Sequence, residues 1–406
     1  MEAVGLDHRT AEPVSNALAN SSLVVENIDT LEQLLALQPQ WRDLELASGN
    51  ALPFRTSDWA ISWWTNFRES RTVVSDSLFV RALRTRSGQL VGIAPMMRTE
   101  RPAVGPFRIK ILQFFGPDGY VTELSGPMSV PTYENQVIHT LLDHLKTSAS
   151  SWDWLSWRGL RVGGPWEQAV AATGSVEWGE EVPGYILPLA GTWEEFRAQL
   201  PRNVKESLRK CYNSLKRDGH TFSFEIARRP EEMGAALEHF CRLHSARAAL
   251  AGTIKHKDFF IAPKARRFLF DVCGRFAQRG EVRVFMLRVG SEIVAARIGF
   301  VIGKSLYLYY SGYDPAFGKY SVMTTVVAEA LRSAISENLT SVNLSMGRDL
   351  SKTRWRPNQT LYREALQISP SSRARLTLSA YRNIRNGLRS SPIRWLASRL
   401  LWRRLD

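Results

Sequence analysis

The sequence predicts an α/β protein made of two tandem units, each a mixed sheet flanked by helices. The chain of 406 residues is too long for one average domain. A pattern of strand, turn, strand, helix and strand occurs twice along it. Helices placed between strands in this way require crossover connections, which are typical of α/β sheets. A hydrophobic content of 44% with 23% charged residues is ordinary for a globular protein and argues against wholesale disorder.

The first copy of the pattern begins with "LFVRALRTRSGQLVGIAPMM" (Leu78–Met97). This stretch alternates as a strand, turns at Ser87-Gly88 and returns as a second strand. The turn "LSGPMSVPTYENQ" then introduces a helix of about four turns, and the short strand "WDWLSW" follows.

The second copy begins with Val282–Val301, which turns at Gly290-Ser291. The turn "YDPAFGKYSV" introduces its helix, and "SVNLSM" is its last strand. Duplication is the simplest explanation, so we expect one unit at 23–187 and another at 188–369. Residues 1–22 are predicted to be disordered, and 370–406 to form a basic amphipathic tail.

The second unit opens with a predicted pair of helices. Thr192 and Glu195 form a capping box, and Gly219 is a suitable residue to end the second helix. Apolar residues fall on one face of that helix, while Lys205 and five other basic residues occupy the rest of it. The basic face is either simply solvated or attracts an anionic cofactor or substrate.

The tail carries much of the formal net charge of +14. Residues 371–406 hold nine arginines, no lysine and a single acid, Asp406. Apolar residues recur between the arginines, a pattern typical of elements that dock to a membrane surface or a partner. Alternatively, a terminal helix packs on its own domain with the arginines in solvent.

Several classes of function are disfavoured. The motifs of dinucleotide-binding enzymes, P-loop enzymes, serine hydrolases and zincins are missing. The three cysteines have no ligand spacing, and His239 and His244 do not share a helix face, so no metal site is expected. No secretory signal or spanning segment is visible, which predicts a cytoplasmic protein, peripheral to the inner face of the membrane if the tail docks there.

The turn "YDPAFGKYSV" contains the parts of a phosphate-binding loop. The strand before it places Tyr307 and Tyr309 on one side and Leu306, Leu308 and Tyr310 on the other. The helix is expected to begin near Tyr320 or Ser321, so free backbone N–H groups would point out of its first turn. An ordinary connection between strand and helix remains the alternative.

At this point the chain resembles the CelD/BcsL acetyltransferase family, a branch of the GNAT superfamily related to the Fem peptidyltransferases. The resembling pieces are "NVKESLRKCYNSLKRDG", "FCRLHSARAALAG", "YYSGYDPAFGKYSVMTTVVAEAL" and "SMGRDLSKTRWRP", with "LPFRTSDWAISWWTNF" and "GQLVGIAPMM" in the first half. The resemblance implies tandem GNAT-like domains and acyl transfer from acetyl-CoA or another acyl-CoA, threaded between two splayed strands and used without a metal.

The resemblance also implies site residues. The cofactor residues are Tyr310, Gly318, Lys319, Tyr320 and Ser321, and the substrate residues are Arg247, Lys352 and Trp355. The usual Q/R-x-x-G-x-G/A signature is not present as such, and Ser351 stands where the family has tyrosine.

Acylation needs a base for the proton of the acceptor and a donor for the departing thiolate. His244 has a suitable pKa for the base, although a core histidine is the alternative. Asp314 is a second candidate base, although Asp before Pro is common in turns. Tyr313 is the candidate proton donor.

The leading interpretation is an acyltransferase acting on a sugar, amino sugar or other cell-envelope or exopolysaccharide precursor. The second is Fem-like transfer from aminoacyl-tRNA, although the short helical pair within 192–218 makes nucleic acid an unexpected partner. The third is a non-catalytic scaffold of a polysaccharide-synthesis complex. The first copy has no lysine beside its turn glycine, so we expect it to be structural and to bind no CoA.

Overall fold

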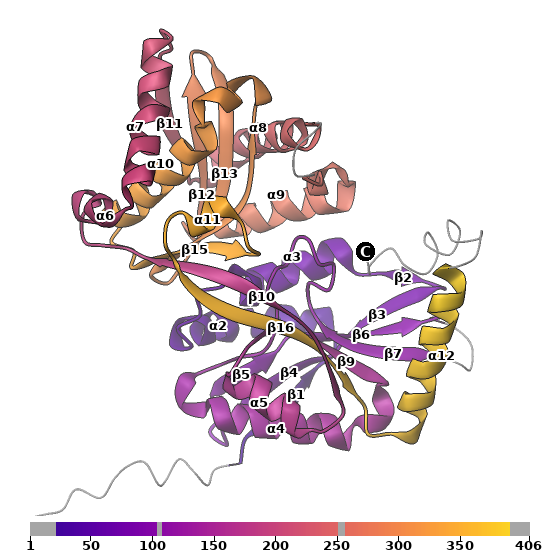
Figure 1. The fold of residues 1–406 in the computed structure, drawn as a ribbon. Coiled ribbons are helices and arrows are strands. Elements are labelled where there is room, and N and C mark those ends of the chain that lie inside the picture. Colours follow the sequence, from indigo (N-terminus) through magenta and orange to yellow (C-terminus); the bar gives the residue numbers. More distant parts are fainter. Residues whose placement is uncertain (1–21, 104–107, 251–255, 390–406) are drawn as a thin grey trace, which may run out of the picture.

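The computed structural model describes residues 22–103, 108–250 and 256–389. Figure 1 shows two α/β halves joined by two long strands that run side by side between them. The strands of the first half are β1 (Val24–Ile28), β2 (Ser70–Arg71), β3 (Val74–Leu78), β4 (Val80–Arg84), β5 (Leu90–Ala94), β6 (Met96–Arg101), β7 (Ile109–Phe114), β8 (Met128–Ser129) and β9 (Trp154–Arg161). Those that follow are β10 (Val176–Pro188), β11 (Phe222–Ala227), β12 (Val282–Val289), β13 (Glu292–Ile302), β14 (Ser305–Tyr313), β15 (Ser341–Met346) and β16 (Asn358–Ile368).

Helices cover both faces of the sheets. The α-helices are α2 (Leu31–Ala47), α3 (Ser57–Phe67), α4 (Glu134–Thr147), α5 (Pro165–Ala172), α6 (Trp193–Gln199), α7 (Arg202–Arg217), α8 (Pro230–Ala248), α9 (Pro263–Gln278), α10 (Val322–Ser336), α11 (Leu350–Thr353) and α12 (Ser372–Arg389). Short 3-10 turns are η1 (Pro53–Arg55), η2 (Pro131–Tyr133), η3 (Ala149–Ser151), η4 (Phe259–Ile261) and η5 (Pro315–Tyr320). Across the described ranges, no helix is both long and apolar enough to span a membrane.

Each half contains the parallel strand pair and crossover helix that the predicted repeat requires. In the first half, three residues of β7 pair in parallel with three of β9. In the second half, Ser305–Tyr307 of β14 pair in parallel with Ser341–Asn343 of β15. Helix α4 connects the first pair and α10 connects the second. Both are crossover connections, as the sequence pattern predicts.

The two halves exchange a strand. β10, which follows the first unit in the chain, pairs antiparallel with β15 of the second half. β16, which follows the second unit, pairs antiparallel with β9 of the first half, and β10 and β16 also pair with each other. The result is one 12-stranded sheet through the molecule, with a separate four-stranded sheet formed by β1, β4, β5 and β8. The predicted boundary at 187/188 therefore falls at the end of a strand that belongs to the sheet of the second half.

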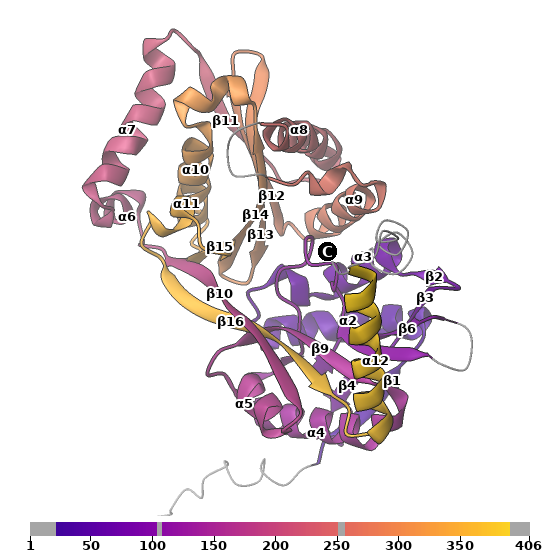
Figure 2. The same ribbon diagram turned by 45° about the vertical axis from the view of Figure 1, so that its right-hand side comes forward.

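The second half buries a core on each side of its sheet. Figure 2 shows α7 and α10 together on one face and α8 and α9 on the other. Leu306 and Leu308 pack under α10, and Tyr307 and Tyr309 pack on the other side, as predicted. Tyr310 was predicted on the leucine side, and that prediction is wrong. A bulge in β14, opposite Arg297 and Gly299 of β13, changes the alternation, so Tyr310 packs with the other two tyrosines.

Local signals in the second half behave as the sequence predicts. Thr192 and Glu195 form a reciprocal capping box at the start of α6. Gly219, which follows α7, has φ of 75°, a left-handed conformation that glycine adopts without a steric penalty. Cys211, Cys241 and Cys273 are buried free thiols.

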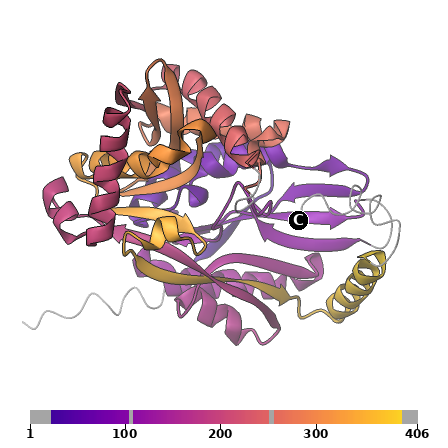
Figure 3. The ribbon, with the colours of Figure 1, turned by 45° about the horizontal axis from the view of Figure 1, so that its top comes forward.

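The described part of the tail, α12, lies along the sheet of the first half (Figure 3). Leu378 packs with Ile111 and Trp154 in a small apolar cluster. Arg382 forms an ion pair with Glu177 of β10. The described portion of α12 is thus packed on its own domain, whereas residues 1–21 and 390–406, which include most of the segment predicted to be disordered and the end of the tail, lie outside the described residues.

Candidate active site between two splayed strands

A cleft opens where β14 and β15 separate. Beyond Tyr307 and Asn343 the two strands no longer pair, and the N-terminus of α10 lies above the gap. A cavity of about 110 Å³ occupies this region. Its wall combines apolar side chains, including Leu308 and Leu344, with Thr324 at the start of α10. We call it the cleft cavity.

Backbone geometry keeps β15 away from β14. Ser345 has φ of 69°, which is rare for a residue other than glycine and tends to mark functional sites. Its N–H is held by the side chain of Asn343 at 2.9 Å. The next N–H, that of Met346, is bound by the carboxylate of Glu123 at 3.0 Å, and the carbonyl of Met346 accepts from Lys352. Side chains therefore replace the bonds that a neighbouring strand would supply.

Four cationic side chains line the cleft cavity: Arg247, Arg297, Lys352 and Arg354. No carboxylate is among the described residues that line it. Arg247 comes from α8, which approaches β14 so closely that a Cβ at Gly312 would lie 2.3 Å from the backbone nitrogen of His244. Gly312 therefore allows α8 to bring Arg247 to the cleft. An excess of positive charge in a narrow cavity favours an anionic ligand.

The cations are only partly paired. Arg247 donates to the hydroxyl of Ser311 at 3.0 Å and to Nε2 of His256 at 2.9 Å. Lys352 donates to the carbonyl oxygens of Met346 and Gly347. Nε of Arg297 is buried and has no hydrogen-bond partner among the described residues. A buried donor left without a partner is costly, so this guanidinium is available for a ligand.

Burial shifts the pKa values of these groups. It lowers the pKa of Arg297 to about 10, with the charge of Arg247 acting in the same direction. It also lowers the pKa of Lys352, while the nearby Glu123 carboxylate opposes that change. The pKa of Glu123 itself is raised, mainly by burial. Shifts of this kind concentrate at functional sites because the groups that cause them are arranged around a ligand.

The start of α10 differs in detail from the prediction. The helix begins at Val322, after the 3-10 turn η5, and Asp314 caps that turn by accepting the N–H of Ala316 at 2.9 Å. Ser321 then takes a left-handed conformation with φ of 55°. Its carbonyl accepts the N–H of Thr324. The N–H groups of Val322 and Met323, which precede that bond in the first turn, have no backbone partner among the described residues and can meet an anion.

The predicted cofactor residues lie in two places. Gly318, Lys319, Tyr320 and Ser321 form the turn before α10. Gly318 is exposed, and the ammonium of Lys319 lies 3.7 Å from Asp218 and is largely in solvent. The ring of Tyr320 is buried, and its hydroxyl donates to Asp218 at 2.9 Å.

Tyr310 lies apart from that turn. Its hydroxyl donates to the carbonyl of Tyr120 in the first half at 2.5 Å, and its ring packs against His244. Tyr310 therefore joins the two halves from the opposite side of the sheet to α10.

The predicted catalytic residues are not brought together. Nδ1 of His244 lies 3.1 Å from the carbonyl oxygen of Ser311, which can only accept, so Nδ1 carries the proton. The ring packs against Phe240 and Phe260 and is not among the residues that line the cleft cavity. Burial lowers its pKa, which favours the neutral ring. Asp314 caps η5, and the ring of Tyr313 lies under Arg247 at 5.9 Å.

The predicted substrate residues do converge. Arg247, Lys352 and Trp355 come from α8, α11 and the residues after α11, and all three line the cleft cavity. Sequence reasoning missed Arg297 and Glu123. Arg297 interrupts the apolar run that follows Glu292 in the strand "EIVAARIGFVI", and that interruption is a usable signal. Glu123 lies in a loop of the first half, and no local pattern connects it with the second.

A known protein family matches most of the second half. Residues 202–355 match the family described as acetyltransferase (GNAT) domain, and the matched range contains β14, α10, β15 and the cationic residues of the cleft. No curated protein sequence matches the chain. The match supports an acyltransferase of the GNAT type.

Solved structures share the fold at low sequence identity. FemX is 11% identical with a TM-score of 0.57, covering 84% of this chain and 97% of that one. The C-terminal domain of a putative lysylphosphatidylglycerol synthetase from Agrobacterium fabrum is 12% identical with a TM-score of 0.50, covering 85% and 96%. A conserved protein of unknown function from Bacteroides thetaiotaomicron is also 12% identical with a TM-score of 0.50, covering 85% and 100%. At these identities the likeness shows the fold alone.

Proposed function

We propose that this GNAT-type acyltransferase binds acetyl-CoA or another acyl-CoA in the cleft between β14 and β15 and transfers the acyl group to a sugar, amino sugar or related cell-envelope or exopolysaccharide precursor. The observation that carries the proposal is the cluster of four cations around the cleft cavity, beneath the N-terminus of α10. Acyl-CoA carries a pyrophosphate, and helix N-termini and arginines are the groups that bind phosphates in proteins.

The chemistry follows from the same residues. The free N–H groups of α10 and the cations bind the anionic part of the cofactor, and the apolar walls at Leu308 and Leu344 accept its neutral arm. Trp355, which is buried, closes one side of the cavity. Positive charge near the thioester also stabilises the oxyanion that forms when the acceptor attacks.

The loop after β7 in the first half is packed in a way that supports a structural role for that half. A Cβ at Gly159 would lie 2.8 Å from the side chain of Leu124, and one at Gly116 would lie 2.3 Å from that of Thr122. At Thr122 and Leu124 the loop that follows β7 therefore packs tightly against its own half, while Glu123 between them bonds to the second half. Together with the missing lysine, this supports a structural first half that binds no CoA.

Calorimetric titration of acetyl-CoA tests the proposal. The wild type is expected to bind one equivalent, and Thr324→Trp, which fills the cleft cavity from α10, is expected to lose at least tenfold in affinity. Ser336→Trp, exposed at the other end of the same helix, is the matched control and should bind normally. Gly318→Trp tests the turn itself. Absence of binding by the wild type would refute the proposal, and two equivalents would refute the assignment of a structural first half.

Fem-like transfer from aminoacyl-tRNA is the second candidate. Helix α7 exposes Arg209, Lys210 and Lys216, and no ion pair to any of them occurs among the described residues. If tRNA bound with a steep salt dependence and charge reversal on α7 abolished it, while acetyl-CoA failed to bind, this candidate would replace the first. Binding of neither would favour the scaffold. The CelD/BcsL assignment stays a prediction.

A further inference from the structure

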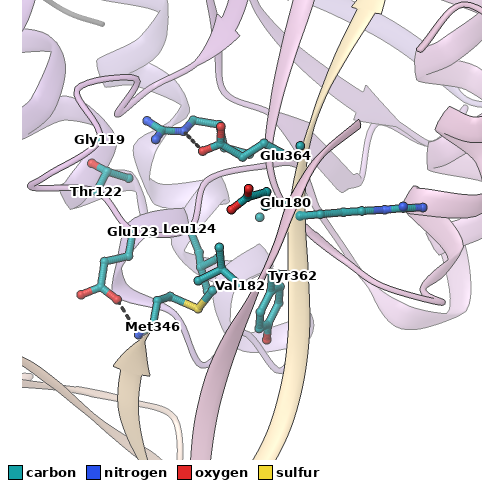
Figure 4. Close-up of a pocket in the computed structure, with 13 residues that line it drawn as sticks. Gly119, Thr122, Glu123, Leu124, Glu180, Val182, Met346, Tyr362 and Glu364 are labelled. Carbon is teal, nitrogen blue, oxygen red and sulfur yellow. Dashed lines mark hydrogen bonds and ion pairs between the residues drawn. The ribbon is translucent and has the colours of Figure 1, made fainter. Parts of the chain in front are cut away.

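A second cavity lies where β10 and β16 cross between the halves. Its volume is about 330 Å³, within the range of small-molecule sites, and we call it the crossover pocket. Figure 4 shows its wall, with Glu123 and Leu124 from the first half, Glu180 and Val182 from β10, and Tyr362 from β16. A bulge in β10 between Trp178 and Glu181 widens the strand pair at this point.

Glu123 connects the crossover pocket with the cleft. It lines the pocket, and its Oε2 accepts the hydroxyl of Tyr307 at 2.7 Å and the N–H of Met346 at 3.0 Å. Those two residues lie on β14 and β15, the strands that separate to form the cleft. Oε2 takes both bonds, and Oε1 has no hydrogen-bond partner among the described residues.

The surroundings of Glu123 suit a proton acceptor. Tyr307 and Met346 fix the carboxylate, so its position does not depend on a ligand. Burial raises its pKa, which brings a carboxylate closer to the value that general bases need near neutral pH. Lys352 and Arg297, which line the cleft cavity, act on it electrostatically and oppose that rise.

The crossover pocket is rich in carboxylates. Besides Glu123 it is lined by Glu180 and Glu364. Glu364 is paired with Arg158 at 2.9 Å, whereas Glu180 is exposed and forms no ion pair within the described part of the chain. Arg363 of the same wall is paired with Glu167. The carboxylates without an ion pair are thus Glu123 and Glu180, and their charge favours a cationic acceptor.

We propose that Glu123 is the general base of the second half's reaction and that the crossover pocket binds an acceptor with a primary amine. The inference rests on the proposed function. The ammonium of the acceptor first gives one proton to Glu123, and the resulting amine nitrogen attacks the thioester carbonyl to form a C–N bond and a tetrahedral oxyanion. When this intermediate collapses, the C–S bond breaks, CoA leaves as a thiolate and takes the second proton from the nitrogen, and Glu123 returns its proton to solvent. The first half, which binds no CoA, would in this way supply a catalytic residue.

Release of free CoA thiol from acetyl-CoA measures the reaction. The probes are D-glucosamine, L-lysine and spermidine, with D-glucose as the matched acceptor that lacks an amine. At least one amine is expected to be turned over above D-glucose. Glu123→Gln should lower kcat for it by a hundredfold or more, in the range known for general bases. Glu123→Asp, which shortens the side chain, should retain part of that rate.

Two readouts separate a catalytic role from a structural one. Glu123→Gln should bind acetyl-CoA within twofold of the wild type, because a glutamine oxygen accepts both hydrogen bonds. The acid limb of the pH profile of kcat/KM should disappear in that variant.

Glu180→Gln tests the binding of the acceptor. It should raise KM for the amine, while Glu194→Gln, exposed on α6, should leave it unchanged.

Each result decides the inference. Normal turnover by Glu123→Gln would overturn the role of Glu123, and turnover of no amine above D-glucose would overturn the assignment of the acceptor. Because binding of acetyl-CoA is measured separately, either failure is distinguishable from failure of the proposed function.

Discussion

The hydroxyl of Tyr307 on β14 donates to the carboxylate of Glu123 at 2.7 Å, across 184 positions of the chain. This bond places a carboxylate of the first half at the point where β14 and β15 of the second half separate. The same carboxylate accepts the N–H of Met346 on β15. Both strands are therefore hydrogen-bonded to a residue outside their own half.

Replacement of Glu123 by glutamine is expected to change how stability depends on pH. Burial raises the pKa of Glu123 in the folded state above that in the unfolded state. The stability that this group contributes is therefore complete below its unfolded pKa and is lost as pH rises through the folded pKa. Glu123→Gln should melt at a higher temperature than the wild type at pH 8 and at nearly the same temperature at pH 4. Equal differences at both pH values, measured by calorimetry beside Glu194→Gln, would contradict this.

Replacement of Arg297 by methionine should separate stability from binding. The guanidinium is partly buried, with one nitrogen unpaired, so its removal should stabilise the ligand-free protein by about 1–3 kcal/mol. The same change should weaken binding of acetyl-CoA at least tenfold. Thermal unfolding and calorimetry measure the two effects, and Arg209→Met, on the exposed face of α7, should produce neither. A destabilised variant with normal affinity would show that Arg297 is structural.

Ser321 is expected to be a strained position. Its φ of 55° is left-handed, and its side chain makes no capping hydrogen bond to α10. Ser321→Gly should therefore stabilise the protein by about 1 kcal/mol. Ser336→Gly, at the helical end of the same element, should instead destabilise it by about 0.5 kcal/mol. Denaturant unfolding measures both, and a loss of stability in Ser321→Gly would indicate that its side chain makes a contact important to the fold.

The exchange of β10 and β16 between the halves predicts that neither half folds on its own. Gly191, exposed just after β10, is a suitable position for an inserted protease site. After cleavage the two fragments should still elute as one particle, because β10 and β16 each pair with strands of the other fragment. A fragment that begins at residue 190 lacks β10 and should not fold alone. Separation of the cut fragments without denaturant would refute the prediction.

The tail gives a prediction in two parts. Leu378 is buried against the sheet, so Leu378→Ala should destabilise the protein by about 2 kcal/mol. Residues 390–406 contain four arginines and one acid, and their deletion should reduce binding to anionic liposomes while binding of acetyl-CoA is kept. Deletion after Ser369 removes α12 as well and should add the loss of stability. Unchanged sedimentation with liposomes would remove the proposed membrane contact.

The sequence by itself determined the features that depend on neighbouring residues. The turns at Gly88 and Gly290, the capping box at Thr192 and the helix after "YDPAFGKYSV" all follow from patterns a few residues long. The duplication was readable because it repeats those local patterns in the same order. The cluster of Arg247, Lys352 and Trp355 came from a family resemblance.

Only the tertiary structure decided which strand completes which sheet and which residues meet at the cleft. Nothing in the residues of β10 and β16 states that each strand pairs with the opposite half. A bulge of one residue in β14 moved Tyr310 to the other face, because side chains alternate with a period of two. Glu123 reaches β14 and β15 because a loop of the first half packs against the point where these two strands separate. Such pairings depend on hydrogen bonds between residues far apart in the chain, and patterns of neighbouring residues do not encode them.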